Sequence, residues 1–454
     1  MIWTKYNHIF KSEKYGILLF NSLTNTFLNL GENVFNKIVK IKNDANSYPF
    51  NDDLKIKNIL IDMGVICDGV DDDIRNRLKL ISALDKYNRD CSNLTIIPTL
   101  DCNFRCTYCY EKDRIKPVYM TDETENALIE FIEQKSKGGK ELRIQWFGGE
   151  PLLAYERIVS ISRKINKLNI NYESAIITNG YLLNLEKIEL LKELKIDKIQ
   201  ITIDGMEETH NKRRPHLRDH KTYNTILNNI ETLFDYTKSN NINIKLDIRI
   251  NVDNQNKKEY SQSYKELKLR FPLAIVYPGI VKNDALTTDR CNNLSCAFSR
   301  KDTSEFYLEQ YNTSAEVGLD YYPTWYGIAG CTATRFNDFV VGPQGEIYAC
   351  WHNVGDDKMI MGNIHNGEVI SNHILFTRFL EGIDPFENDK CKNCFYLPIC
   401  GGGCPYDRIL NKYYGQHIET CTMHKGKKTL EKMLEIHYEM KLKHKPENIG
   451  NITI

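Results

Sequence analysis

Hydrophobic positions in the central half of the chain follow two alternating patterns. Short apolar runs typical of buried strands are followed by longer segments with apolar residues at helical spacing. Strand and helix in alternation predict βα units whose strands pair in parallel. The expected strands are 94–99, 142–147, 174–178, 197–203, 243–251 and 273–277, and the expected helices are 121–136, 154–167, 185–194, 221–237 and 256–269. The predicted fold class is α/β, with six units curled into a partial (β/α)6 barrel of the TIM type.

The segments on either side of this barrel have different patterns. Before it, strand-like runs at 15–20 and 26–30 flank a polar turn, and helical spacing recurs at 32–41 and 53–63, which predicts a winged-helix-like module. After it the regular spacing fades and Gly and Cys become frequent, until a terminal helix at 427–443 and a loose tail. The expected domains are residues 1–90, 91–280, 281–425 and 426–454.

Composition excludes several kinds of partner. Lys plus Arg and Asp plus Glu are 60 each among 454 residues, so the formal net charge is zero. This balance favours neither nucleic acid nor an anionic membrane surface. No apolar stretch approaches the roughly 20 residues of a membrane span. The first residues lack the layout of a signal peptide, so we expect a cytoplasmic protein.

The 14 cysteines are unevenly distributed. Three lie at 102–109 and nine lie between Cys291 and Cys421, whereas Cys67 and Cys91 stand apart. In a reducing compartment disulfides are not expected, and clustering of this kind indicates metal ligation. We interpret the two isolated cysteines as small buried hydrophobic residues.

The first cluster, Cys102, Cys106 and Cys109, has the spacing C-x3-C-x2-C and follows the first predicted barrel strand. Ligands of such barrels bind at the carboxyl ends of the strands. Three thiolates can hold three irons of a [4Fe–4S] cluster and leave the fourth iron open. An open iron can bind a small molecule and pass it an electron, as reductive cleavage of S-adenosylmethionine (SAM) requires. A zinc site or three buried structural cysteines are the alternatives.

A glycine pair follows the second predicted strand, in the run Gly148-Gly149-Glu150-Pro151. Glycines let a backbone approach a ligand closely, and exposed peptide carbonyls suit the amino group of the SAM methionyl moiety. A tight turn is the alternative interpretation.

Together the cysteine triplet and the glycine pair resemble the radical SAM superfamily, over residues 94 to about 255. Tyr108 stands where that family has an aromatic residue before the third cysteine. Thr202 replaces the family's strand-end serine and keeps the hydroxyl. The resemblance implies that SAM contacts come from Tyr108, Gly148, Gly149, Glu150, Pro151, Thr178, Asn179, Thr202, Asp204, Arg214, Arg249 and Asn251.

A second constellation of seven cysteines lies between 331 and 421. Its C-x2-C pair is compatible with zinc as well as with iron–sulfur clusters. Beside a radical SAM core it resembles the SPASM domain, which carries two auxiliary [4Fe–4S] clusters, so the resemblance implies three clusters and SAM as cofactors. It implies an outer cluster and an inner one nearer SAM, held respectively by Cys391, Cys394, Cys400 and Cys421, and by Cys331, Cys350 and Cys404.

The inner set departs from the family's fullest pattern, because it lacks a fourth cysteine before Cys350. Cys291 and Cys296 are the remaining candidates. If neither binds, the inner cluster has an open iron that a substrate thiolate could occupy.

The residues after Cys350 bear on the substrate. Anaerobic sulfatase maturases have an Asp there as a base, whereas this chain has Trp351 and His352. Histidine side chains in general can exchange a proton near neutral pH, so His352 is the candidate catalytic base. A histidine that only packs on the cluster, or lies on the surface, is the alternative.

The N-terminal module resembles the peptide-recognition element of enzymes that mature ribosomally made peptides. Such elements bind a leader peptide as an added strand on a sheet edge. The resemblance implies a precursor peptide as partner, an electron donor such as flavodoxin or ferredoxin, and a thioether or other crosslink of the sactionine or ranthipeptide type as product. A maturase of a folded protein, such as a sulfatase or a quinohemoprotein subunit, and a non-catalytic metal scaffold remain alternatives.

Overall fold

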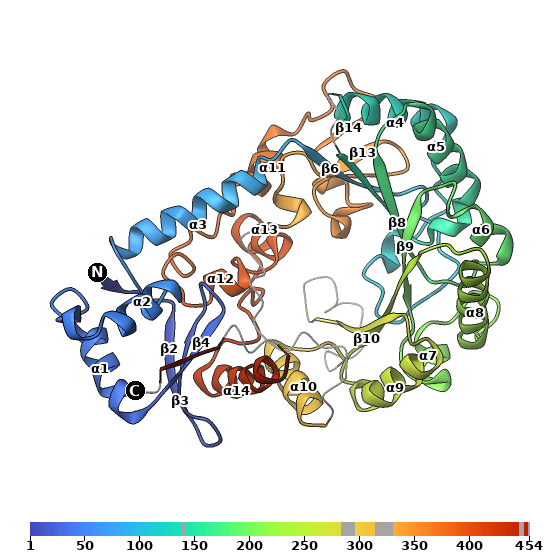
Figure 1. Cartoon of the computed structure of the whole chain (residues 1–454). Helices are drawn as coiled ribbons and strands as arrows, with labels where there is room; N and C mark the ends of the chain where they lie inside the picture. The colour runs from blue at the N-terminus through green and yellow to red at the C-terminus, as the bar shows by residue number, and fades with distance from the viewer. Residues whose placement is uncertain (138–140, 283–295, 314–329, 445–448, 453–454) are drawn as a thin grey trace.

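The computed structural model describes residues 1–137, 141–282, 296–313, 330–444 and 449–452. Figure 1 shows an N-terminal module on one side, a barrel-like sheet with outer helices on the other, and the C-terminal part between them. The long helix α3 (Asp71–Lys86) leads from the module to the barrel.

Six parallel strands form the barrel, in the order β11-β10-β9-β8-β7-β6. Their apolar residues are buried against helices on the outer face, as expected where both faces of a parallel sheet are covered. The strands are β6 (Cys91–Ile96), β7 (Glu141–Trp146), β8 (Tyr172–Thr178), β9 (Ile196–Thr202), β10 (Lys245–Val252) and β11 (Ile275–Ile280). The helices are α4 (Asp122–Lys135), α5 (Tyr155–Lys167), α6 (Leu185–Leu190), α7 (Glu207–Arg213), α8 (Tyr223–Ser239) and α9 (Tyr260–Arg270). The predicted α/β class and partial barrel are confirmed.

Helices α6 and α9 are shorter than predicted, and α7 was not predicted. Helix α9 begins at Tyr260, four residues after the predicted start. Helix α6 ends at Leu190, four residues before the predicted end. The periodicity gave no sign of α7, since its sequence is polar and offers no apolar stripe. The side chains of His210 and Arg213 on α7 are nevertheless buried, so polar contacts rather than a hydrophobic face fix this helix.

The barrel sheet continues into the C-terminal part. Strand β12 (Phe339–Val341) pairs in parallel with β6, and β13 (Glu346–Tyr348) and β14 (Gly362–Asn363) follow in antiparallel fashion. The remaining helices here are α10 (Arg300–Thr313), α11 (His373–Thr377), α12 (Leu397–Cys400), α13 (Pro405–Tyr413) and α14 (Lys427–His444). Pairing between β12 and β6 places the cysteine-rich segment beside the first barrel strand.

The N-terminal module is a three-stranded antiparallel meander followed by helices. Its elements are β1 (Ile2–Trp3), β2 (Asn7–Ser12), β3 (Gly16–Asn21), β4 (Thr26–Leu30), α1 (Glu32–Asn43), α2 (Leu54–Asp62) and β5 (Ile66–Cys67), with β1 pairing to β5. One face of the meander packs on α1 and α2, and the other packs on α14. The expectation of a loose C-terminal tail is wrong for β15 (Ile449–Ile452), which pairs with β4.

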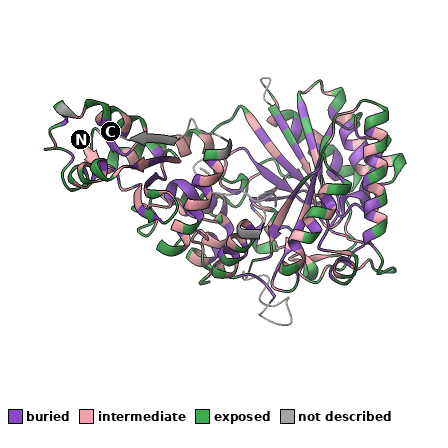
Figure 2. Ribbon diagram, turned by 60° about the horizontal axis from the view of Figure 1, so that its bottom comes forward, coloured by how far each residue is buried: buried purple, intermediate pink, exposed green. Residues whose placement is uncertain are grey.

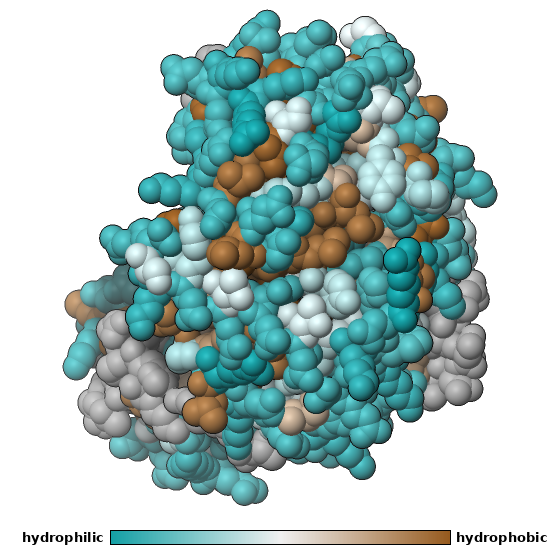
Figure 3. Space-filling view, turned by 90° about the vertical axis from the view of Figure 1, so that its right-hand side faces the viewer, coloured by the Kyte–Doolittle hydropathy of each residue, from teal (hydrophilic) through white to brown (hydrophobic). Residues whose placement is uncertain are grey.

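Burial follows this arrangement. Figure 2 shows buried residues along the barrel strands and exposed residues on the outer sides of the helices. The helix-covered face in Figure 3 is largely hydrophilic and is crossed by a hydrophobic band. Among the described residues, no helix combines the length and hydropathy that crossing a bilayer demands.

Candidate active site

The loop that carries the cysteine triplet leaves the carboxyl end of β6 and is fixed by backbone hydrogen bonds. The Arg105 N–H donates to the Pro215 carbonyl at 2.9 Å, and the Thr107 N–H donates to the Arg213 carbonyl at 3.0 Å. Cys109 N–H closes a turn on the Cys106 carbonyl at 3.2 Å. The segment after α7 therefore holds the triplet in place from the other side of the barrel mouth.

The thiols of the triplet are close enough to influence one another. Burial, and next the neighbouring Cys106 and Glu150, raise the pKa of Cys102 well above its ordinary value. Burial also raises the pKa of Cys106. These sulfurs are therefore protonated as free thiols, and a metal that binds them must displace the protons. The buried, clustered sulfur donors suit an iron–sulfur cluster.

The predicted glycine pair packs directly on this loop. A Cβ on Gly149 would stand 2.2 Å from the Asp101 carbonyl oxygen, and one on Gly148 would stand 2.6 Å from that of Thr99. Gly148 also has a φ of +126°, which side-chain-bearing residues rarely adopt. Only glycine at both positions lets this backbone lie against the residues that precede Cys102.

Glu150 ties the glycine segment to the end of β8. Its buried carboxylate accepts from the Thr178 hydroxyl and the Asn179 N–H, both at 2.7 Å, and from the Leu152 N–H at 2.9 Å. Burial raises the pKa of Glu150. Asn179 Nδ2 donates to Asn103 Oδ1 at 2.8 Å. The structure thus brings Gly148–Pro151, Thr178 and Asn179 together with the cysteine loop.

Tyr108 connects the cysteine loop to the far side of the barrel. Its hydroxyl accepts from Arg214 Nη1 at 2.7 Å and from Asn251 Nδ2 at 3.0 Å. The guanidinium of Arg213 lies 4.8 Å from the centre of its ring. Tyr108, Arg214 and Asn251 therefore form one hydrogen-bonded group.

Asp204 is buried within an ionic network below this group. Its carboxylate accepts from Arg213 Nε at 3.4 Å and from the Asn251 N–H at 3.1 Å. Arg213 in turn contacts Asp253 through Nη1 at 2.7 Å. Through these hydrogen bonds Asp204 joins the ends of β9 and β10. Its bond to the backbone N–H of Asn251 fixes the position of Asn251.

Three buried nitrogen donors at this mouth lack a hydrogen-bond partner among the described residues. They are Arg214 Nε, Asn103 Nδ2 and Arg249 Nε. Arg249 is in register with Thr202 on the neighbouring strand. A buried donor without a partner is costly, so these atoms are suited to the oxygens of a bound ligand such as SAM.

The cysteines of the C-terminal part fall into two groups. Burial raises the pKa of Cys350, and the nearby thiols of Cys331 and Cys404 raise it further. We call Cys331, Cys350 and Cys404 the inner group. Burial raises the pKa of Cys400 to about 11, with further contributions from the thiols of the outer group, Cys394, Cys391 and Cys421. Lys425 Nζ donates to Cys421 Sγ at 2.9 Å. The assignment of these two groups to an inner and an outer cluster stays a prediction.

The two candidates for a fourth inner ligand do not join this group in the described structure. Cys296 is buried, its carbonyl accepts from the Asn254 N–H at 2.8 Å, and its sulfur is in a disulfide. The expectation that no cysteine forms a disulfide is therefore wrong for Cys296. Cys291 lies outside the described residues.

His352 lies between the triplet and the inner group. Its ring stacks on Tyr110 with centroids 4.2 Å apart and planes at 15°, and its other neighbour is Tyr406 at 5.6 Å. Burial raises the pKa of Tyr110, and both Cys109 and Cys350 act on it. Tyr110 and His352 therefore form an aromatic contact between the two cysteine sets.

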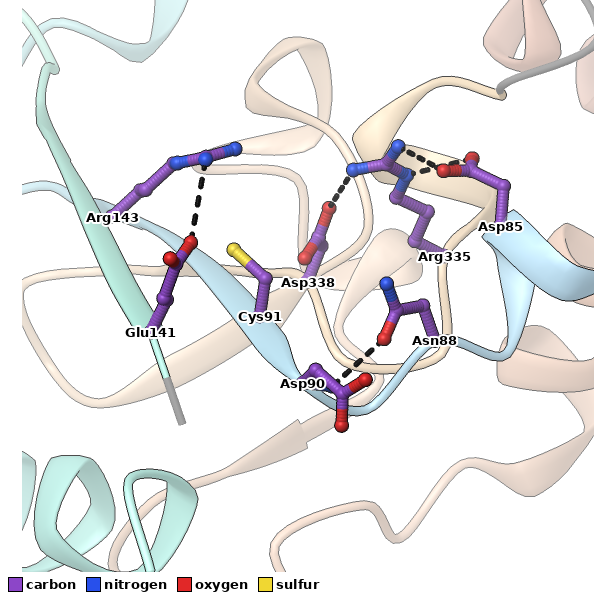
Figure 4. Close-up of a pocket in the computed structure, with 8 residues that line it drawn as sticks. All are labelled: Asp85, Asn88, Asp90, Cys91, Glu141, Arg143, Arg335 and Asp338. Atoms are coloured by element: carbon purple, nitrogen blue, oxygen red, sulfur yellow. Dashed lines mark hydrogen bonds and ion pairs between the residues drawn. The ribbon is translucent and has the colours of Figure 1, made fainter. Parts of the chain in front are cut away.

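The cavity in Figure 4, of about 530 Å³, is not at this mouth. It opens at Cys91 and Glu141, the first residues of β6 and β7, at the opposite end of the barrel. Its guanidinium groups are paired, since Arg335 contacts Asp85 at 2.5 Å and Arg143 contacts Glu141 at 3.5 Å. This cavity is a polar junction between α3, the barrel and the C-terminal part.

Within the described ranges, no three His, Cys, Asp or Glu side chains converge on a single-ion site. The ligands of a four-iron cluster stand on different iron atoms and so need not converge on one point. Sequence reasoning missed Arg213, Asp253, Asn103 and Tyr110. A doubled arginine before Pro215 and a tyrosine directly after Cys109 were the available signals.

Residues 96–267 match the model of the Radical SAM superfamily. This part of the chain is a radical SAM domain. The chain is 26% identical over 340 residues to the cysteine-type anaerobic sulfatase-maturating enzyme of Clostridium novyi (strain NT), covering 67% of this chain and 85% of that relative.

Two solved structures share the fold of this chain. anSMEcpe with bound AdoMet and Cp18Cys peptide has a TM-score of 0.57 at 20% identity, covering 78% of this chain and 98% of that chain. Streptococcus suis SuiB bound to precursor peptide SuiA has a TM-score of 0.51 at 15% identity, covering 94% and 100%. These likenesses confirm the predicted fold.

Proposed function

We propose that this enzyme matures a ribosomally made precursor peptide and closes an intramolecular thioether or other crosslink in it. The observation that carries the proposal is the N-terminal module, a small sheet with helices on both faces. Such a sheet can accept an extended peptide only at an edge. The SuiB fold, which in that structure holds a precursor peptide, extends over 94% of this chain, against 78% for the sulfatase-maturase fold.

The barrel mouth supplies the binding site for the reactive group. Cys102, Cys106 and Cys109 would hold a [4Fe–4S] cluster, and bound SAM with that cluster would supply a 5′-deoxyadenosyl radical for hydrogen abstraction. The carbonyls around Gly148 and Gly149 would accept hydrogen bonds from the amino group of SAM. The unpartnered donors of Arg214, Asn103 and Arg249 suit its carboxylate and nucleoside oxygens. Thr202 adds a hydroxyl at the end of β9.

Glu150 and Asp204 position neighbouring groups of the site. Glu150 fixes the ends of β7 and β8 relative to each other through three hydrogen bonds. Asp204 fixes Asn251 and is itself neutralised by Arg213. Both carboxylates therefore keep the SAM-facing backbone and amide groups in place.

The two C-terminal cysteine groups would hold the auxiliary clusters. The inner group offers three cysteines, which leaves one iron for the thiolate of a peptide cysteine. His352, stacked on Tyr110, lies between that group and the triplet and could accept the proton that such a thiol releases. This arrangement would bring the sulfur of the substrate close to the carbon from which hydrogen is removed.

The module is attached beside the outer cysteine group. Ser22 Oγ donates to the Phe395 carbonyl at 2.8 Å, and Lys5 Nζ donates to the Lys392 carbonyl at 3.3 Å. A leader peptide docked here keeps its core segment near the barrel and raises the local concentration of that segment. Flavodoxin or ferredoxin would supply the electron.

The test is anaerobic reconstitution with iron, sulfide, SAM and the precursor peptide encoded beside the gene, followed by mass spectrometry. Crosslinking predicts a loss of two hydrogens from the peptide. A Cys102→Ala variant should give no product, whereas the matched Cys67→Ala variant should react normally. SAM cleavage with an unchanged peptide mass would refute crosslinking.

A second candidate function is maturation of a folded protein, which the sulfatase-maturating relative favours. The residue after Cys350 argues against it, because Trp351 packs on Phe147 at 5.4 Å and supplies no base there. Conversion of a sulfatase-derived cysteine peptide to an aldehyde by this enzyme would establish the second function instead.

A further inference from the structure

The chain's own C-terminal strand covers one edge of the N-terminal sheet. Strand β15 runs parallel to β4, with Ile449 opposite Phe27 and Ile452 opposite Leu30. The sheet order is β15-β4-β3-β2, so β15 is the outermost strand. The edge of β4 is therefore paired with a strand of the same chain, β15.

The two faces of the same sheet are closed to a peptide. Leu19, Leu28 and Leu30 pack towards α1 and α2, and Leu18, Phe20 and Phe27 pack towards α14. Peptide recognition by this sheet thus has to use an edge. Among the strands that the structure describes, β15 is the one that uses the β4 edge.

Helix α14 delivers β15 to this edge. Near its end Lys441 Nζ donates to the Asn25 carbonyl, and His437 Nε2 bonds Asn25 Oδ1 at 3.1 Å. Tyr438 accepts from Asn29 Nδ2 at 3.3 Å through its hydroxyl. Since Asn25 precedes β4 directly, the helix ends where β4 begins, and four residues separate helix from strand. So short a tether gives an effective concentration on the order of millimolar.

The strand itself is weakly held. It is four residues long, has a partner on one side, and contains Gly450 and Asn451, which disfavour strands. Short edge strands fray readily. The tether favours occupancy of the edge, and the poor strand sequence keeps that occupancy reversible.

We propose that the edge of β4 is the one that binds a leader peptide, and that β15 is a displaceable occupant of this edge that lowers its apparent affinity for the leader. The inference rests on the proposed function for the identity of its competitor. A leader must displace β15 before it can pair with β4. Binding therefore takes place on the fraction of molecules whose tail has left.

The experiment deletes residues 445–454 from the chain and adds the same segment back as a separate peptide. The probe is a fluorescein-labelled synthetic decapeptide of residues 445–454, measured by anisotropy with the full chain and with a chain ending at His444. We expect the truncated chain to bind the probe about tenfold or more tightly than the full chain. Hydrogen exchange at the amides of β4 should accelerate on truncation and slow again when the probe is added.

Two double variants test whether the effect of β15 depends on its backbone hydrogen bonds to β4 or on its side chains. Gly450→Pro with Asn451→Pro removes both central N–H groups, so in the full chain it should reproduce the truncation. The matched pair Gly450→Ala with Asn451→Ala keeps the N–H groups and should retain the low affinity for the probe.

Equal probe binding by the full and truncated chains would overturn the proposal, and so would a truncated chain that melts much earlier and binds no probe. The second result would make β15 a structural strand. Neither result needs a precursor peptide. Failure of the proposed function shows separately, as an unchanged precursor mass in the crosslinking assay.

Discussion

The close packing of Gly149 on the cysteine loop allows a sharp test of the barrel mouth. In Gly149→Ala the new Cβ would stand 2.2 Å from the Asp101 carbonyl oxygen and 2.9 Å from that of Leu100. The new Cβ would clash with backbone atoms, so the clash cannot be relieved by rotation of a side chain. The two segments must part by about 1 Å to reach ordinary van der Waals separation.

Parting the segments also breaks a hydrogen bond. The Glu150 N–H donates to the Asp101 carbonyl at 2.8 Å, and that bond is worth about 1 kcal/mol. Overpacking adds about 1–3 kcal/mol. We therefore expect Gly149→Ala to lower the free energy of unfolding by about 2–4 kcal/mol. Because Asp101 precedes Cys102 directly, the displaced loop also misplaces the first iron ligand.

Catalysis should suffer more than stability alone explains. A displacement near 1 Å at a reacting centre can lower the rate about 100-fold. The assay is the rate of 5′-deoxyadenosine formation from SAM with dithionite, alongside iron content and thermal unfolding. Gly367→Ala is the matched control, since nothing lies within 4 Å of its Cβ position. Wild-type cleavage and stability in Gly149→Ala would refute the close-packing argument.

Three further results are expected. Arg213→Met leaves two buried carboxylates unpaired and should cost about 3–5 kcal/mol in urea unfolding, whereas Arg163→Met, whose pair is exposed, should cost less than about 1 kcal/mol. Burial lowers the pKa of His437 to about 2, so its stabilising contribution is complete above the ordinary pKa of 6.5 and falls with pH below it. Unfolding of the metal-free chain at pH 5 should show a loss of about 2 kcal/mol, and in His437→Gln this part of the pH dependence should vanish. Cys400→Ala should lower the iron content by about one cluster with SAM cleavage retained; Cys67→Ala should keep all its iron, and an iron count unchanged in Cys400→Ala would argue against an outer cluster.

Much of the barrel could be predicted because its signals are local. Apolar runs and helical spacing depend on neighbouring residues, so strands such as β8 and β9 lie within about two residues of their predicted bounds. Helix α7 could not be predicted this way, because polar contacts made with β9 and β10 bury it. Strand β15 was missed for a related reason, since its sequence is a poor strand former and a partner over 400 residues away fixes it.

The candidate site divides in the same way. Tyr108, Arg214 and Asn251 could be named from a family resemblance, and the fold brings them together. Asp204 is predicted to contact SAM, and in the structure its carboxylate accepts hydrogen bonds from Arg213 and from the Asn251 N–H. The choice between a ligand contact and a brace depends on which partner reaches the carboxylate, and the sequence carries no information on that distance.

The sequence by itself determined the chemistry of this protein. Three cysteines at C-x3-C-x2-C spacing after a strand form a chelating loop whatever surrounds them, and seven further cysteines provide ligands for more metal. The tertiary structure alone decided which thiols stand together, that Glu150 joins two strand ends, and that the C-terminal strand covers the β4 edge. The physical reason is that residue spacing fixes local geometry, whereas contacts between distant segments follow from how buried faces and unpaired backbone groups are satisfied across the whole fold.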